Sequence, residues 1–187
     1  FHGTTEFIRT GRYVGNSYGG NTFNGPVTIN NDGISGRMRL AETAGDVFNA
    51  DATFESSGLE IQVGYSGTSE FDADVYINHS AINFNSGSGT CSFTGSGIQQ
   101  LFGSANYSFE NLTINQSGSN PLISREIQLG TTLSVDGILT LTNGILFTDS
   151  TDILTMKAGS STSGASNNRF VSGPIKKIGN TAFTFPV

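Results

Sequence analysis

The sequence contains no tryptophan, a single cysteine and four prolines, and only 13% of its 187 residues are charged. With one cysteine the chain cannot form an internal disulfide framework, and we expect Cys91 to be a small buried hydrophobe in the strand TCSF. Nine basic residues against fifteen acidic ones give a net charge of −6 and a pI near 4.7. Nucleic acids require clustered Lys and Arg, so this balance argues against a nucleic-acid partner.

Long hydrophobic runs are also missing. No segment approaches the length of a membrane-spanning helix, so we expect no membrane insertion, and no signal peptide opens the chain. The chain begins at Phe1 without a methionine, and we expect it to be a single repetitive segment, residues 1–187, excised from a longer protein. Hydrophobic residues make up 35% of the chain, which is low for a globular domain and predicts a narrow core.

What the sequence has instead is repetition. The frame FNGPVTINN, which starts at Phe23, returns as FNADATFES from Phe48, as FDADVYINH from Phe71 and, one residue shorter, as FENLTINQ from Phe109. Within each copy apolar or small residues alternate with mostly polar ones, which predicts a strand with one buried face and one wet face. Units of about 23 to 25 residues are too short to be domains, so we expect each to stack on its neighbours.

Stacked units of this kind predict an all-β fold. We expect a β-solenoid, a right-handed parallel β-helix of about eight coils, because crossovers between parallel strands are right-handed. The expected inward anchors after Phe23 are Phe48, Phe71, Phe93, Phe109, Leu133, Leu154 and Phe170. The dipeptide Asn143-Gly144 lies between alternating runs and is a hairpin signal, so an antiparallel β-sandwich or meander stays open as the alternative.

The repeats also carry a resemblance to a known class of protein. The run GGNTFNGPVTINN, followed by GDVFNADATF and SGTSEFDADVYINHS, resembles the repeat of very large cell-surface proteins of Bacteroidetes. The stretch LSVDGILTLTNGILFTDSTDILTM, with GASNNRFVSGPIKKIGNTAFTFPV, is similar to the segment that closes such arrays. These matches span Gly19 to Val187, and the unit from Cys91 to Tyr107 departs from the commonest form of the repeat.

The resemblance implies a secreted adhesin similar to the mobile gliding adhesins that the type IX secretion system exports. The implied role is a structural and adhesive stalk segment, extracellular and on the cell surface, that serves gliding motility or surface attachment and has no enzymatic activity. Its implied partners are neighbouring repeats of the same chain, the secretion machinery, and extracellular surfaces or polysaccharides. Asp149-Ser150-Thr151 resembles the short O-glycosylation signal of these organisms, which makes Ser150 a candidate glycosylation site.

Aspartates form the candidate metal site. Asp72 and Asp74 occupy polar places in one copy, and Asp51 is the counterpart of Asp74 in the preceding copy. If the copies stack in register, Asp51 lies over Asp74 at about 4.8 Å. Like charges this close repel one another, and a bound Ca²⁺ would relieve the repulsion. We therefore predict calcium as a possible cofactor, bound by Asp51 and Asp74, with two solvated carboxylates as the alternative.

Two further functions stay open beside the stalk. Tyr76 is placed outward by the alternation and could stack on a sugar, which would make the chain a glycan-binding module. A polysaccharide-active β-helix enzyme would need convergent carboxylates or a basic residue beside them, and no such constellation stands out in the sequence. His79 has no acid partner fixed near it by sequence, so we interpret it as a polar corner residue.

Overall fold

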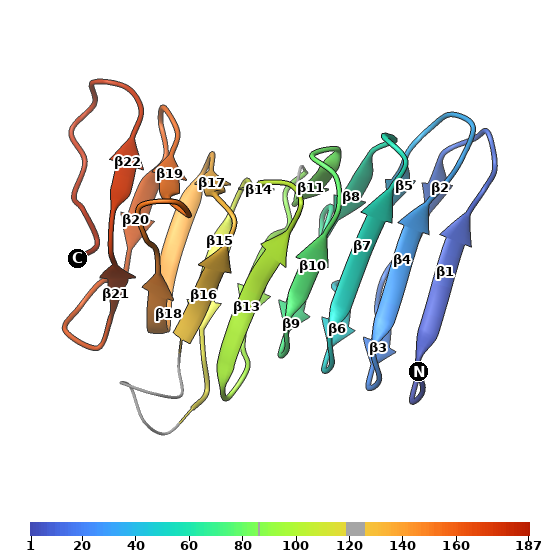
Figure 1. The fold of residues 1–187 in the computed structure, drawn as a ribbon, viewed down its shortest axis with the longest axis horizontal. Helices are drawn as coiled ribbons and strands as arrows, with labels where there is room; N and C mark the ends of the chain where they lie inside the picture. The colour runs from blue at the N-terminus through green and yellow to red at the C-terminus, as the bar shows by residue number, and fades with distance from the viewer. Residues whose placement is uncertain (86, 119–125) are drawn as a thin grey trace.

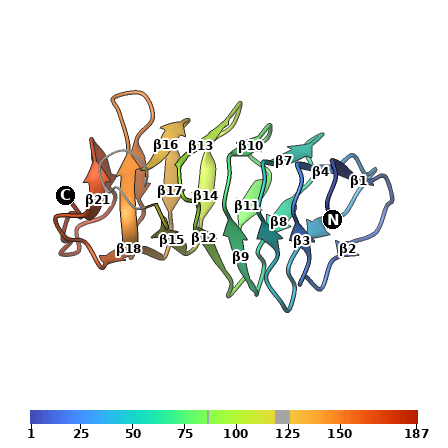
Figure 2. The same cartoon turned by 90° about the horizontal axis from the view of Figure 1, so that it is seen from below.

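The computed structural model describes residues 1–85, 87–118 and 126–187. This part of the chain contains strands, turns and bends but no helix, and hence no helix that could span a membrane. The strands stack in parallel into a β-solenoid, which confirms the predicted fold class. Figure 1 and Figure 2 show the coils advancing along the long axis of the molecule from the N-terminal to the C-terminal end.

Three parallel sheets form the sides of the solenoid. Sheet A consists of β1 (Thr5–Arg9), β4 (Val27–Asn31), β7 (Ala52–Ser56), β10 (Val75–Ile77), β13 (Ile98–Gly103), β16 (Glu126–Gly130), β18 (Ile138–Phe147) and β21 (Arg169–Ser172). Sheet B consists of β2 (Gly15–Asn16), β5 (Met38–Arg39), β8 (Ile61–Val63), β11 (Ile82–Phe84), β14 (Tyr107–Phe109), β17 (Leu133–Val135), β19 (Leu154–Met156) and β22 (Ile175–Lys177). Sheet C consists of β3 (Thr22–Phe23), β6 (Val47–Phe48), β9 (Thr68–Phe71), β12 (Thr90–Phe93), β15 (Leu112–Asn115), the first half of β18, and β20 (Ser161–Ser163).

Each turn passes through the sheets in the order A, B, C. In Figure 1 the chain rises along sheet A at the front, crosses to sheet B behind and returns through sheet C below as it advances toward the C-terminal end. This winding is right-handed, as expected for crossovers between parallel strands. The described strands make about seven turns, after which β21 and β22 begin another.

Phenylalanine rings form one column of the core. Phe23, Phe48, Phe71 and Phe93 end successive strands of sheet C and pair in register. Their ring centroids lie 5.0, 4.8 and 5.3 Å apart from one ring to the next, and no ring is more than 3% exposed. Burial of one such side chain contributes roughly 1.5–3 kcal/mol, so the column is a main source of stability along this side.

The first turn contains a copy of the motif that the sequence reading missed. Phe1 stacks on Phe23 with ring centroids 5.1 Å apart, and Thr5 pairs with Val27. FHGTT therefore occupies the place that FNGPV occupies one turn later. The corners of the first two turns pack so closely that a Cβ atom added to Gly25 would lie 2.7 Å from the Gly3 carbonyl oxygen.

Beyond Phe93 the expected inward anchors Phe109, Leu133 and Leu154 are buried, as predicted, but they do not continue this column. Phe93 pairs with Ile114 in sheet C, whereas Phe109 ends β14 in sheet B and stacks on Phe84 with ring centroids 4.6 Å apart. FENLTINQ therefore forms the corner from sheet B to sheet C, while FDADVYINH forms the corner from sheet C to sheet A. The later predicted anchors also lie outside sheet C, with Leu133 and Leu154 in sheet B and Phe170 in sheet A.

The motif itself spans a corner rather than one continuous strand. In its third copy β9 ends at Phe71 and β10 begins at Val75, so the three residues between them turn the chain from sheet C to sheet A. Phe71, Val75 and Ile77 still point into the core, each 0% exposed. The alternation thus predicted these buried residues correctly, but it predicted one continuous strand where the structure has two strands joined by a corner.

Asn143-Gly144 does not form a hairpin. β18 continues through both residues, pairs with β15 up to Asn143 and with β16 and β21 from Gly144 onward, and all of these pairings are parallel. Gly144 has φ of 106°, a left-handed conformation that glycine adopts without steric cost and that lets the strand bend from sheet C into sheet A. The antiparallel sandwich or meander is therefore wrong.

We predict that Phe71→Ala lowers the free energy of unfolding by about 3–5 kcal/mol, because it removes a ring stacked between two others and leaves a cavity. Phe102→Ala is the matched control. Its ring is 38% exposed on the outer surface, and its loss should cost about 1 kcal/mol or less. Urea unfolding followed by circular dichroism measures both, and equal losses would contradict the role of the column.

Candidate functional site

The candidate metal residues Asp51 and Asp74 stack in successive turns, as predicted. Both lie in the corner between sheets C and A, directly before β7 and β10. The backbone N–H of Asp74 donates to Oδ1 of Asp51 at 3.3 Å, and the backbone N–H of Gln100 donates to Oδ1 of Asp74 at 2.8 Å. Each carboxylate therefore accepts a hydrogen bond from the backbone of the following turn, and this contact joins neighbouring corners.

Asp72 makes a similar contact from the other end of the same corner. Its Oδ1 accepts a hydrogen bond from the hydroxyl of Thr94 in the next turn. These bonds occupy one oxygen of each carboxylate. The Oδ2 atoms of Asp51 and Asp74 have no protein donor among the described residues and are the atoms that a cation could use.

A calcium ion at this corner would have few protein ligands. Ca²⁺ takes six to eight oxygen ligands, and two carboxylates supply a minority of them. Within the described ranges, no three His, Cys, Asp or Glu side chains are grouped closely enough to hold a metal ion. Carbonyl oxygens and water would have to complete the shell, so any such site is expected to be weak. The calcium site stays a prediction.

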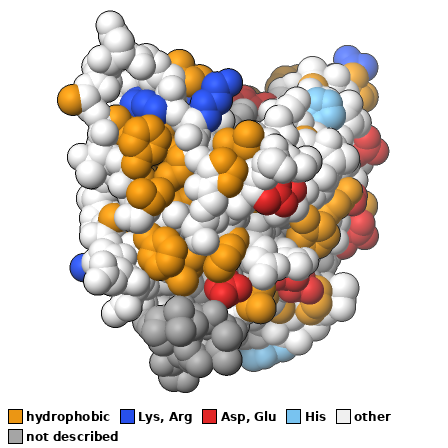
Figure 3. Space-filling view, turned by 60° about the vertical axis from the view of Figure 1, so that its left-hand side comes forward, with side chains coloured by type: hydrophobic (Ala, Val, Ile, Leu, Met, Phe, Trp, Pro, Cys, Tyr) orange, Lys and Arg blue, Asp and Glu red, His pale blue; other side chains and the backbone are white. Residues whose placement is uncertain are grey.

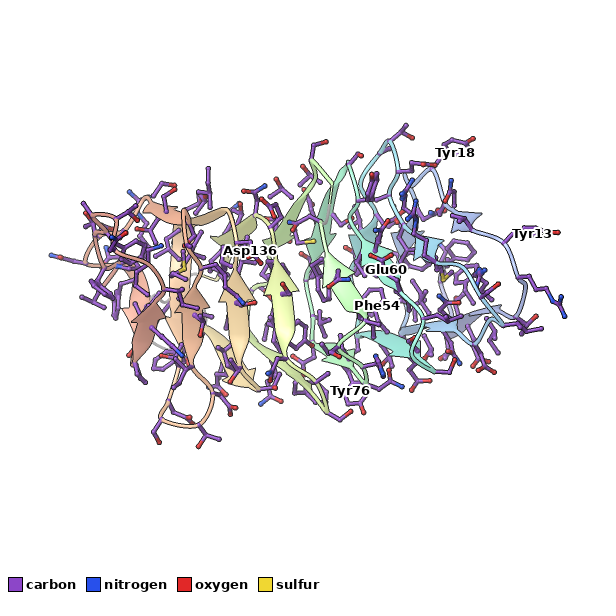
Figure 4. The ribbon with its side chains drawn as sticks, turned by 90° about the horizontal axis from the view of Figure 1, so that it is seen from above. Tyr13, Tyr18, Phe54, Glu60, Tyr76 and Asp136 are labelled. Carbon is purple, nitrogen blue, oxygen red and sulfur yellow. The ribbon has the colours of Figure 1, made fainter. Side chains whose placement is uncertain are left out.

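Tyr76 projects from the outer face of sheet A, opposite in direction to the buried Phe54 (Figure 4). It pairs in register with Phe102 of the next turn, and the two rings meet edge to face with centroids 5.4 Å apart. Phe102 was not predicted from the sequence, because the corner before β13 is longer than the corners of the earlier copies and its amino-acid sequence differs from theirs. A pair of aromatic rings on an outer face is a larger stacking surface than the single ring that was expected.

Two shallow grooves continue this surface toward the C-terminal end. The first, of 110 Å³, is lined by Gln100, Phe102, Gln128, Leu129 and Gly130. The second, of 230 Å³, is lined by Gln128, Leu129, Phe147, Thr148 and Asp149. Hydrophobic and acidic side chains both reach the surface on the side of the molecule that Figure 3 shows. Aromatic rings and amide groups thus lie in neighbouring rows on this part of the outer face of sheet A.

Ser150 lies exposed in the short connection between β18 and β19. The carboxylate of Asp149 accepts hydrogen bonds from the backbone N–H groups of Thr151 and Asp152, at 2.7 and 2.8 Å. These bonds hold the pKa of Asp149 below its usual value. The turn presents the Ser150 hydroxyl at the surface, where a transferase could reach it, and glycosylation of Ser150 stays a prediction.

His79 and Cys91, which the sequence analysis also considered, contribute to the structure of the solenoid. Nδ1 of His79 accepts the backbone N–H of Ala81 at 3.0 Å, which fits a polar corner residue. Cys91 is fully buried, as expected, and burial raises the pKa of its thiol. Tyr13 and Tyr18 project from loops at the N-terminal end, 87% and 72% exposed, away from Tyr76 (Figure 4).

A cavity of 160 Å³ lies at the N-terminal end of the core. Its lining is mostly apolar and includes Phe1, Phe7, Phe23, Met38, Leu40 and the carboxylate-bearing Asp46. Burial raises the pKa of Asp46, while hydrogen bonds from the backbone and side chain of Asn21 act in the opposite direction. Asp46 thus accepts hydrogen bonds from the preceding turn, whereas Asp51 and Asp74 accept theirs from the following turn.

Comparison of the chain with models of protein families, with curated proteins and with solved structures gives no match.

We predict that calcium binds weakly at Asp51 and Asp74 and raises the melting temperature, because it relieves the repulsion between the two carboxylates. Asp74→Asn should abolish this response and change the free energy of unfolding by only about 0.5 kcal/mol, since an amide oxygen still accepts the Gln100 N–H. Asp136→Asn, on another corner, should leave the response intact. Calorimetric titration without heat, together with no melting shift on adding chelator, would refute the site.

Proposed function

We propose that the chain is a structural and adhesive stalk segment of a large secreted cell-surface adhesin. Such a segment holds a binding part of the molecule away from the cell and contributes to gliding motility or surface attachment. The proposal assigns the chain an extracellular location and no catalytic role. Export by the type IX system, and an origin in Bacteroidetes, are parts of the same proposal and rest on the resemblance of the repeats.

One observation carries the stalk role. The parallel pairing continues from β1 to β22, so the three sheets run along the whole described length of the molecule. Each turn adds about 4.8 Å along the axis and binds the next through backbone hydrogen bonds. An assembly of this kind gains length and stiffness by adding turns, which is what a spacer between a cell and a surface needs.

Antibodies against the purified chain should label intact, unpermeabilised cells of the organism that produces it. The expected result is surface staining that disappears when secretion is blocked or the gene is deleted. An antibody against a cytoplasmic protein serves as the control for cell integrity. Staining that appears only after permeabilisation would contradict the cell-surface proposal.

A glycan-binding module is the second candidate, and the Tyr76–Phe102 pair favours it. Aromatic rings on an outer face give sugar rings an apolar surface to stack on, while Gln100 and Gln128 beside them can hydrogen-bond hydroxyl groups. This site would suit a neutral saccharide, because the groove beside Phe102 is lined by uncharged residues. A polysaccharide-active enzyme remains the weaker alternative.

We predict that Tyr76→Ala and Phe102→Ala each weaken retention on a neutral polysaccharide column by about tenfold, the value expected when one stacking ring worth about 1.4 kcal/mol is lost. Tyr18→Ala removes an equally large exposed ring from a different part of the surface and is the matched control. Affinity electrophoresis in gels that contain the polysaccharide measures the effect. Equal retention of all three variants would exclude this face as the binding site.

A further inference from the structure

The outer face of sheet B carries one polar side chain from each of five successive turns. Ser108 pairs with Ser134, Ser134 with Thr155, and Thr155 with Lys176. Asn83 joins the row at its other end, because Phe84, the next residue, pairs with Phe109. The parallel register therefore builds a straight row of amide, hydroxyl and ammonium groups along the axis, with a step of about 4.8 Å.

This row forms the floor of a groove of 520 Å³. We call it the sheet B groove, and its lining includes this row together with Tyr107, Thr132 and Lys157. Asp136 belongs to the corner after β17 and lies well apart from Tyr76, which is on sheet A (Figure 4). The sheet B groove is thus separate from the aromatic pair on sheet A.

Two ammonium groups stand at the C-terminal end of the groove. Lys176 is exposed and Lys157 is half-buried, and neither ammonium has a carboxylate or hydrogen-bond partner among the described residues. The third lysine of this region, Lys177, is different, because its ammonium donates to the Lys157 carbonyl oxygen and to the Ser160 hydroxyl. Two cations without internal partners give this end of the groove a positive charge that attracts an anion.

Several hydroxyl groups of the sheet B groove make only long hydrogen bonds within the protein. The Ser134 hydroxyl donates to the Tyr107 carbonyl oxygen at 3.3 Å, and the Thr132 hydroxyl to the Thr151 carbonyl oxygen at 3.4 Å. The Ser108 hydroxyl donates to Asp136 at 3.4 Å. Hydrogen bonds of this length are long for hydroxyl donors, so these groups can turn to a ligand at little cost.

We propose that the sheet B groove binds an acidic glycan, with the carboxylate or sulfate groups of the glycan at Lys157 and Lys176 and its hydroxyl groups along Ser134, Thr155 and their neighbours. One polar group per turn suits a polymer that presents hydroxyl groups at every unit, and the step between turns is close to the length of one sugar ring. The unpartnered lysines select negative charge. This binding goes beyond the stalk role and does not depend on it.

Other anionic polymers fit the groove less well. An extended peptide binds sheets by pairing with an edge strand, and the backbone groups of this row are already paired with neighbouring turns. Single-stranded nucleic acid binds through aromatic rings on which bases stack, and the one aromatic residue of the lining, Tyr107, is 1% exposed. Its hydroxyl is used inside the protein, donating to the carbonyl oxygens of Val75 and Phe102.

Binding of the full chain to four probes tests the proposal: a hexamer of galacturonic acid, dextran sulfate, the neutral maltohexaose, and polyglutamate as an acidic polymer without sugar hydroxyl groups. We expect both acidic glycans to bind in low salt, maltohexaose not to bind, and the affinity for the acidic glycans to fall as salt is added. The double variant Lys157→Gln with Lys176→Gln should lose about tenfold in affinity, as expected for two exposed ion pairs. Circular dichroism of the variants verifies that the fold is retained.

Arg12→Gln is the matched control for Lys176→Gln. Both substitutions remove one exposed positive charge, but Arg12 lies in the loop between β1 and β2, at the other end of the molecule. Affinity should fall for Lys176→Gln and stay within about twofold of the unmodified chain for Arg12→Gln. Failure of both acidic glycans to bind, equal losses in the two variants, or equally tight binding of polyglutamate would each overturn the proposal. Cell-surface labelling tests the stalk role separately from this result.

Discussion

Parallel backbone pairing between one turn and the next is the constraint on which the rest of the structure depends. Because the pairing keeps register, each inward residue lies directly over its counterpart, and a column holds only if consecutive residues have compatible shapes. Phe23, Phe48, Phe71 and Phe93 satisfy this condition with nearly parallel rings. The same register aligns outward residues, so the surface consists of rows whose chemistry depends on which side chain occurs once per turn.

At the corners, polar side chains form the contacts between one turn and the next. Backbone N–H groups that leave the sheets still need acceptors when they are covered by the next turn. Asp51, Asp74 and Asp46 supply carboxylate oxygens, and Asn85 supplies an amide oxygen to the N–H groups of Glu110 and Asn111. The aspartates that form the candidate metal site therefore also have a structural use at these corners.

The motif that begins with Phe was enough to predict the parallel solenoid, the buried face of the strands in the recognised copies, and the stacking of Asp51 over Asp74. The prediction was wrong where similar sequences form different corners of the solenoid. FENLTINQ has the same hydrophobic alternation as the earlier copies, yet it forms the corner from sheet B to sheet C. The alternation indicates which residues are buried, but it does not indicate which sheet a strand joins. Phe102 and the sheet B groove were not predicted for a related reason. Both depend on the register between turns, and Ser and Thr are too common to reveal a row.

The passage of β18 through Asn143 and Gly144 has a consequence for how the molecule comes apart. Elsewhere in the described ranges a corner separates one strand from the next, so neighbouring turns can in principle open one at a time, as in other linear arrays. β18 pairs with β15 and β20 through its first half and with β16 and β21 through its second. Detaching β18 therefore breaks its pairing in sheet C and in sheet A at the same time. This couples the turns around β18 into one cooperative unit, which opposes fraying from the C-terminal end.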